Sequence, residues 1–219
     1  MIASKGCLKK ISTLIVFVSL FLFSQFSVAS SIKHLDINEL LLGAELVFEG
    51  KVIAKKTRWN ANKTDIVTDI TFSVNDIVVG AFEEATLTLV FVGGTVDGST
   101  VTIQGSEMPA LNEQGVYFVE SISKPLVNPL TGWAQGHFII QADESGAMRV
   151  LTQNKMAVTG VQTQSLQKKS LQKGFLSKGV ASGILVKKMS DSVSSAPMLA
   201  DDFKAQLKAQ MLTLKKKEL

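Results

Sequence analysis

Alternation of apolar and polar side chains constrains the fold of this chain more than any other feature. The clearest run lies between residues 66 and 75. There, one apolar and one polar set alternate: Ile66, Ile70, Phe72 and Val74 against Asp69, Thr71, Ser73 and Asn75. A period of two places the two sets on opposite faces of a β-strand, one toward a core and one toward water. Residues 46–55 and 86–92 repeat the pattern, with Glu49 on the polar face, so we predict an all-β fold.

Turn signals divide the chain into short segments. Residues 60–63 (Asn-Ala-Asn-Lys) predict a hairpin turn, and Asp97-Gly98 predicts another. Residues 124–132 hold two of the four prolines and are interpreted as a long surface loop. Three further strands are predicted at residues 116–122, 136–142 and 147–151. Many short strands with frequent turns favour a sandwich or a small barrel, for which we expect five to seven strands.

Helices are predicted at the two ends of this β domain. Asp36, with Glu39 three residues on, is typical of a capped helix start, and Gly43 would end that helix after one or two turns. Near the C-terminus, an apolar stripe recurs every four residues at Leu199, Phe203, Leu207 and Met211. The chain therefore divides into a signal peptide (1–30), a β-barrel domain (31–152), a low-complexity linker (153–196) and a basic amphipathic helix (197–219).

The first 30 residues predict export. Three lysines precede an apolar run, and Ser27-Val28-Ala29 has the small-x-small pattern of a cleavage site, with cleavage after Ala29 or Ser30. The alternative is an uncleaved anchor, although the run is about half the roughly 20 residues that a spanning helix needs. The only cysteine, Cys7, lies inside this segment. We expect a periplasmic or secreted mature chain without a disulfide or a transmembrane span.

Charge is distributed unevenly between the domain and the tail. Residues 31–150 carry 8 basic and 15 acidic side chains, whereas residues 151–219 carry 12 basic and 4 acidic ones. The basic tail could bind an anionic surface such as lipid, polysaccharide or an acidic partner. We favour the alternatives that it is a solvated linker or that it folds back onto its own acidic domain. The terminal helix would then dock mainly by its apolar stripe, because exposed charges are screened within about 8 Å at physiological salt.

The residues predict no catalytic apparatus and no cofactor. His34 and His137 have no metal-ligand spacing, and no nucleophile elbow, phosphate loop or dinucleotide motif is present. Asp65 and Asp69 could present two carboxylates on one strand face, but we interpret that face as a solvated one. The candidate binding surface consists of aromatic and cationic side chains near turns and glycines: Trp59, Trp133 and Arg58.

The order of these segments resembles a known family. The chain runs through residues 44–52 (AELVFEGKV), 68–74 (TDITFSV), Gly93-Gly94, a loop at Pro109, residues 116–119 (VYFV) and residues 136–138 (GHF). It is similar in this to bacterial exported proteins with a netrin-like domain, the OB-type barrel also found in tissue inhibitors of metalloproteinases. The resemblance covers about residues 40–142. It implies a five-stranded barrel and a binding role, with a secreted protease as one candidate partner. Those inhibitors bind zinc through an N-terminal cysteine, which the mature chain lacks.

Three hypotheses follow. The first is a non-enzymatic exported binding module whose partner is an envelope protein or another surface rather than nucleic acid. The second is an inhibitor or accessory factor of a secreted protease that acts by surface contact. The third is a hydrolase, which should gather titratable groups in one cleft, whereas a binding module should expose an apolar or aromatic patch.

Overall fold

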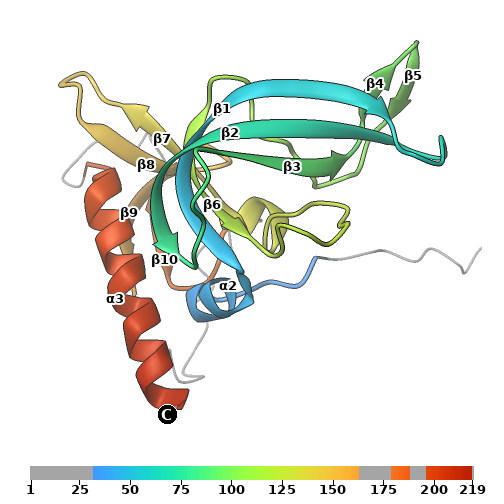
Figure 1. Ribbon diagram of the computed structural model, residues 1–219. Coiled ribbons are helices and arrows are strands. Elements are labelled where there is room, and N and C mark those ends of the chain that lie inside the picture. The colour runs from blue at the N-terminus through green and yellow to red at the C-terminus, as the bar shows by residue number, and fades with distance from the viewer. Residues whose placement is uncertain (1–31, 163–178, 188–195, 219) are drawn as a thin grey trace, which may run out of the picture. The chain divides into compact units, whose positions relative to one another are not determined.

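An open antiparallel sheet forms most of the structure. The computed structural model describes residues 32–162, 179–187 and 196–218 (Figure 1). Eight strands follow the order β10-β9-β8-β7-β6-β1-β2-β3. Their bounds are β1 Leu46–Trp59, β2 Ile66–Val79, β3 Thr86–Val92, β6 Gln114–Val119, β7 His137–Ala142, β8 Met148–Thr152, β9 Ala157–Val161 and β10 Ile184–Lys187. A separate hairpin consists of β4 (Gly94–Val96) and β5 (Ser99–Val101). The all-β prediction is confirmed in its coarser form, because the described residues are mostly β, with α2 (Ile37–Gly43) and α3 (Ala200–Glu218) as the helices predicted near the two ends.

The predicted barrel of five to seven strands is not what the described residues form. The sheet has eight strands, and its order has two ends, β3 and β10, which do not pair with each other. Near the end of β3, the Val92 N–H donates instead to the carbonyl of Val127, in a loop that lies beside the strand. Strands β9 and β10 come from the range 153–196, which the composition predicted as a linker. The expected signal peptide (1–30) and the Gln- and Lys-rich residues 165–173 lie outside the described residues.

Local signals in the sequence produce the expected turns and caps. Asp36 caps α2 (Ile37–Gly43) by accepting the N–H groups of Asn38 and Glu39, and the Glu39 carboxylate accepts the Asp36 N–H. Asn60 and Asp65 close the turn between β1 and β2 through their backbones. Positive φ values at Asp97 and Gly98 match the predicted two-residue turn between β4 and β5.

Two cores lie on opposite faces of β1 and β6. Alternate residues of β6 divide between them, Val116 and Phe118 on one face and Tyr117 and Val119 on the other. The helix-covered core consists mainly of Ile37, Leu40, Leu41, Val47, Val79, Val116, Phe118, Phe138, Ile140, Val150, Val158, Ile184, Phe203 and Leu207. The open-edge core consists of Leu46, Phe48, Val52, Ile70, Phe72, Leu87, Leu89, Phe91, Tyr117, Val119 and Leu130. The sheet is therefore an interior layer along β6 and the first half of β1.

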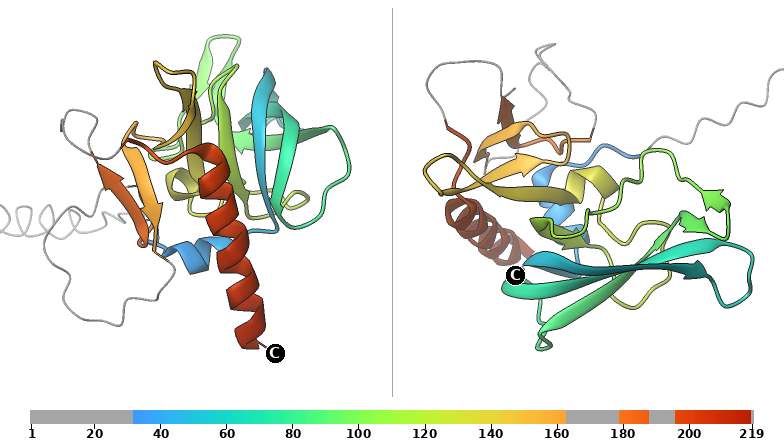
Figure 2. Two further views of the ribbon diagram at one scale, coloured as in Figure 1. Left: turned by 90° about the vertical axis from the view of Figure 1, so that its left-hand side faces the viewer. Right: turned by 90° about the horizontal axis from the view of Figure 1, so that it is seen from above.

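The C-terminal helix α3 (Ala200–Glu218) closes the helix-covered core (Figures 1 and 2). Of the predicted stripe, Phe203 and Leu207 are fully buried, and Met211 is partly buried against this core. Leu199 precedes the helix and is 38% exposed, and Ala200 is buried in its place. Phe203 packs on Phe138 with ring centroids 4.9 Å apart.

A buried ion pair also anchors α3. The Lys204 ammonium contacts the carboxylates of Glu49 at 2.5 Å, Asp201 at 3.1 Å and Asp76 at 3.2 Å. Glu49 was expected on the solvent face of β1, but it is 9% exposed because α3 covers this part of the strand. Burial by itself lowers the pKa of Lys204, but its hydrogen bonds to Glu49 and Asp201 outweigh that effect and raise the pKa above its ordinary value of 10.5. Docking therefore combines apolar contact with a desolvated charge.

Candidate functional site

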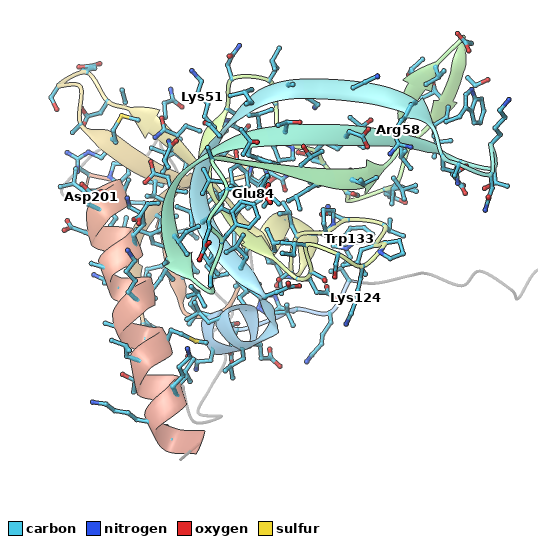
Figure 3. The ribbon with its side chains drawn as sticks, in the orientation of Figure 1. Lys51, Arg58, Glu84, Lys124, Trp133 and Asp201 are labelled. Carbon is cyan, nitrogen blue, oxygen red and sulfur yellow. The ribbon has the colours of Figure 1, made fainter. Side chains whose placement is uncertain are left out.

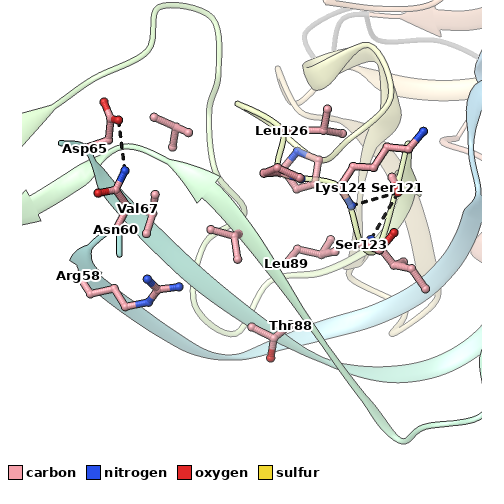
Figure 4. Close-up of a pocket in the computed structure, with 15 residues that line it drawn as sticks. Arg58, Asn60, Asp65, Val67, Thr88, Leu89, Ser121, Ser123, Lys124 and Leu126 are labelled. Atoms are coloured by element: carbon pink, nitrogen blue, oxygen red, sulfur yellow. Dashed lines mark hydrogen bonds between the residues drawn. The ribbon is translucent and has the colours of Figure 1, made fainter. Parts of the chain in front are cut away.

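A cleft of about 390 Å³ lies between the edge strand β3 and the loop of residues 121–129 (Figure 4). We call it the β3 cleft. Its volume is within the range of roughly 300–1,000 Å³ typical of ligand sites. Apolar and polar side chains line it together: Arg58, Asn60, Asp65, Val67, Thr88, Leu89, Val90, Val92, Ser121, Ile122, Ser123, Lys124, Pro125, Leu126 and Pro129.

The β3 wall of the cleft is an edge of backbone as well as a row of side chains. Thr88, Val90 and Val92 pair with Thr71, Asp69 and Val67 of β2. The Val92 N–H points away from β2, since it donates to the Val127 carbonyl at 2.9 Å. In an antiparallel ladder, every second residue has this outward orientation of both N–H and C=O. The backbone groups of Thr88 and Val90 therefore also face outward, toward the cleft.

The opposite wall is held in place by polar contacts at both of its ends. Glu45, which precedes β1, accepts hydrogen bonds from the Ser121 hydroxyl at 2.8 Å and the Ile122 N–H at 3.1 Å. At the other end, Asn128 is buried, donates to the Ser106 hydroxyl and accepts the Leu130 N–H. These contacts tie the 121–129 loop to the sheet, so the cleft is formed before any ligand enters.

Charged groups lie at both ends of the β3 cleft (Figure 4). Arg58 makes two hydrogen bonds to the Asp69 carboxylate, at 2.7 and 2.9 Å, and this contact raises the pKa of the guanidinium. Asp65 accepts hydrogen bonds from Asn60 and Thr64. Lys124, on the loop, is exposed and takes part in no ion pair within the described residues. Lys124 is thus the cation most readily available to an anionic ligand group.

The structure separates the three residues predicted as a binding surface. Arg58 lines the β3 cleft (Figure 4), and Figure 3 labels Arg58 and Trp133 at separate places on the molecule. Trp59 is half-buried at the end of β1, opposite Ile66, and does not line the cleft. Trp133 begins the short helix η2 (Trp133–Gly136) with φ of 58° and is also half-buried outside the lining. The two tryptophans are therefore not part of the cleft lining.

A buried acid–base pair lies outside the cleft. His137 Nε2 is 2.6 Å from a carboxylate oxygen of Glu113, and the His137 ring packs on Tyr117 with centroids 5.2 Å apart. Burial by itself raises the pKa of Glu113, but the hydrogen bond and charge of His137 outweigh it and hold the pKa below 4.5. Burial is also the main cause that raises the pKa of Tyr117 above its ordinary value.

The other titratable residues considered from the sequence do not come together. Asp69 accepts from Arg58, Asp65 lies in the turn before β2, and His34 contacts the Ser182 hydroxyl at 2.7 Å. Across the residues that the structure describes, no three His, Cys, Asp or Glu side chains are placed to hold a metal ion. Those residues also contain no helix long and apolar enough to cross a membrane.

Sequence reasoning missed most of the cleft. Residues 121–129 and the edge of β3 meet only in three dimensions, although each carries a signal. The loop contains Pro125 and Pro129, and β3 contains neither a charge nor a proline, the residues with which exposed sheet edges are usually protected. In comparisons with known proteins, the chain matches no protein-family model, no curated protein and no solved structure.

Proposed function

We propose that this protein is an exported, non-enzymatic binding module that holds its ligand in the β3 cleft. The observation that carries the proposal is a cleft already formed beside β3, an edge with which no other strand of the described residues pairs except β2, and both walls of the cleft are fixed by the fold. Its lining includes exposed apolar side chains, with Val90 at 41% and Ile122 at 38%. A preformed, mainly apolar site with a few oriented polar groups favours binding.

The hydrolase hypothesis has less support than the binding hypothesis. The closest acid–base pair, Glu113 and His137, is buried against Tyr117 and does not line the cleft. A general base needs to lie within hydrogen-bond reach of the reacting group, directly or through one water. No observation favours a protease as the partner over other envelope components.

Affinity capture with matched variants tests the binding proposal. The mature chain, Val90→Lys and Leu185→Lys would each be immobilised and exposed to the envelope fraction of the producing cell. Val90 and Leu185 lie on the two edge strands and are 41% and 43% exposed, so the second variant controls for an added surface lysine. We expect a component that the mature chain and Leu185→Lys retain and Val90→Lys does not. Equal capture by all three proteins would contradict the proposal.

Export is part of the same proposal and has its own test. The lysine-rich start and the Ser27-Val28-Ala29 pattern support cleavage by a signal peptidase. N-terminal sequencing of protein from the producing cell should begin at Ser30 or Ser31. Protein that retains Met1 and fractionates with membranes would contradict it.

We also propose that strands β7-β6-β1-β2-β3 correspond to the five strands of a netrin-like, OB-type domain. In support, β1 pairs with β2 along most of its length but with β6 only over Leu46–Lys51, and three register shifts interrupt the β1–β2 pairing. Such irregularities bend strands and are common where sheets curl toward barrels. A crystal structure in which these five strands diverge from OB topology would exclude the relationship.

A further inference from the structure

We propose that the ligand of the β3 cleft is an extended peptide that adds to β3 as a further strand and places an acidic side chain at Lys124. This inference rests on the proposed function and deepens it, because it names the class of ligand. It follows from three features: the outward-facing backbone groups of β3, the 121–129 loop opposite them, and the charge of Lys124 on that loop.

The edge of β3 offers a peptide its main hydrogen bonds. Thr88 and Val90 each turn one N–H and one C=O away from β2, and within the described residues no strand or loop pairs with these groups. Backbone pairing supplies affinity in strand addition, while side-chain pockets on alternate positions supply specificity. Val92, two residues further on, already has the equivalent bond from its N–H to Val127. The Val127 carbonyl thus already occupies one of the outward-facing backbone positions of β3, and a peptide would pair with the next ones.

The 121–129 loop makes a single strand a better occupant than a second copy of the protein. Neighbouring strands lie about 4.8 Å apart, and the loop lines the cleft on the side opposite β3. A peptide needs only the space of one strand. A second copy would bring its own β2 behind its β3, and that sheet would meet the loop, which Glu45 and Asn128 hold in place.

Side chains around the cleft indicate which peptides would bind. Val90 and Ile122 are exposed apolar groups on the two walls, so uncharged β-branched or other apolar side chains would be favoured between them. Lys124 has no carboxylate partner among the described residues, whereas Arg58 already pairs with Asp69. An acidic side chain or terminal carboxylate near Lys124 would therefore complement the charge of the loop.

The first step of the test is a selection with a defined probe. Random nine-residue peptides displayed on phage would be panned on the mature chain, with Val90→Lys used to remove peptides that bind elsewhere. We expect enriched sequences with alternating apolar positions and one acidic residue. Failure to enrich any peptide that discriminates against Val90→Lys would overturn the peptide proposal. If envelope capture still distinguishes the same two proteins, the cleft binds a different class of ligand and the proposed function stands.

The second step leaves the protein unchanged and therefore does not depend on how variants fold. Single N-methyl groups would be placed along one enriched peptide, and the Kd of each would be measured. Strand addition predicts a period of two, with losses of at least tenfold where the peptide N–H faces β3 and smaller losses at the intervening positions. Losses without that period, or a period typical of a helix, would overturn strand addition.

Lys124 has a separate measurement with a matched control. Replacement of the peptide's acidic residue by its amide should weaken binding to the mature chain by about threefold, as for an exposed ion pair. The same replacement should have no effect on Lys124→Ala and should keep its threefold effect on Lys215→Ala, whose substitution lies on the far helix α3. Equal effects of the amide on all three proteins would exclude Lys124 as the partner of the acid.

Discussion

The two larger cores among the described residues are similar in composition but differ in how the chain assembles them. The open-edge core comes from residues 46–130, mostly from β1, β2 and β3, which pair in sequence order, together with β6, which pairs with β1. The helix-covered core combines α2 at one end of the described chain, β9 and β10, and α3 at the other end. Long-range contacts of this kind carry a larger loop-closure cost. The second core should therefore depend on segments that can be removed, and the first should not.

The two cores also differ in the role that we assign to them, one in stability and the other beneath the proposed binding site. The helix-covered core is closed by Phe203 and Leu207, which are fully buried, and by the buried Lys204. The open-edge core lies beneath β3, whose outer edge has no partner strand among the described residues. We infer that α3 protects one face of the sheet, while the β3 cleft leaves the other side available to a ligand.

Deletion of residues 197–219 should have the largest effect on this comparison. It removes Phe203 and Leu207, each worth about 1.5–3 kcal/mol of burial, and leaves Glu49 without Lys204. We expect a lower free energy of unfolding at both low and high salt, measured by chemical denaturation. As a control, the exposed residues 215–217 would be changed from lysine to serine, with little effect. If the deletion is neutral for stability but abolishes a salt-sensitive association with anionic lipid or polysaccharide, the helix acts as an interaction arm instead.

Single truncations should affect the two cores equally. Phe72 in the open-edge core and Phe203 in the helix-covered core are both fully buried, so replacement of either by alanine should cost about 3–5 kcal/mol. The cores should differ in whether they still fold when residues 197–219 are deleted. In the deletion protein, Phe72→Ala should keep its cost if the open-edge core folds alone, and the measurement is the difference in unfolding free energy. A deletion protein that no longer unfolds cooperatively would show that the two cores form one cooperative unit.

Two carboxylates also make largely buried contacts, Glu49 with Lys204 and Glu113 with His137, and the contact at α3 should be the more costly to break. Lys204→Met leaves the buried Glu49 carboxylate with the Gln114 amide as its one side-chain partner among the described residues, so we expect a loss of about 3 kcal/mol. The double variant Lys204→Met with Glu49→Leu should recover most of this loss, because it removes the unpaired charge. Denaturation of the two single variants and the double variant measures the coupling. Additive losses would show that Glu49 does not depend on Lys204.

The contacts of Glu113 and Lys204 should weaken at opposite extremes of pH. The pKa of Glu113 is held below its ordinary 4.5, so its contact with His137 stabilises the fold above pH 4.5, and this is lost as pH falls further. The pKa of Lys204 is raised above 10.5, so its contribution is complete below pH 10.5 and is lost as pH rises beyond it. Unfolding free energies against pH would measure both. Wild type and Glu113→Gln should differ in unfolding free energy by about 1 kcal/mol at neutral pH, and this difference should decrease in acid. The corresponding difference between wild type and Lys204→Met should decrease in alkali.

The sequence predicted the open-edge half of the molecule better than the helix-covered half. Alternation at residues 66–75 and turn residues at 60–63 are local signals, and β2 and its hairpin follow them closely. Strand β10 has only four residues, and the polar composition of residues 153–196 conceals it. Burial of Glu49 depends on α3, which lies far away in sequence, so its position on the polar face of the pattern was misleading. The β3 cleft was missed for the same reason, since its two walls are local features that meet only after folding.

Substitutions on the two edge strands, β3 and β10, should have the smallest effects on stability. They also give the most direct comparison of ligand binding. Val90 and Leu185 are exposed to a similar degree on β3 and β10. Lysine at either position adds a charge at the surface without removing a buried group, so each should change the free energy of unfolding by less than about 0.5 kcal/mol. At position 90 the new ammonium would also lie opposite Asp69, its partner on β2, which favours tolerance. The two variants should therefore unfold alike, and only Val90→Lys should lose the ligand of the cleft. If Leu185→Lys loses the ligand as well, binding depends on the whole sheet rather than on the edge of β3.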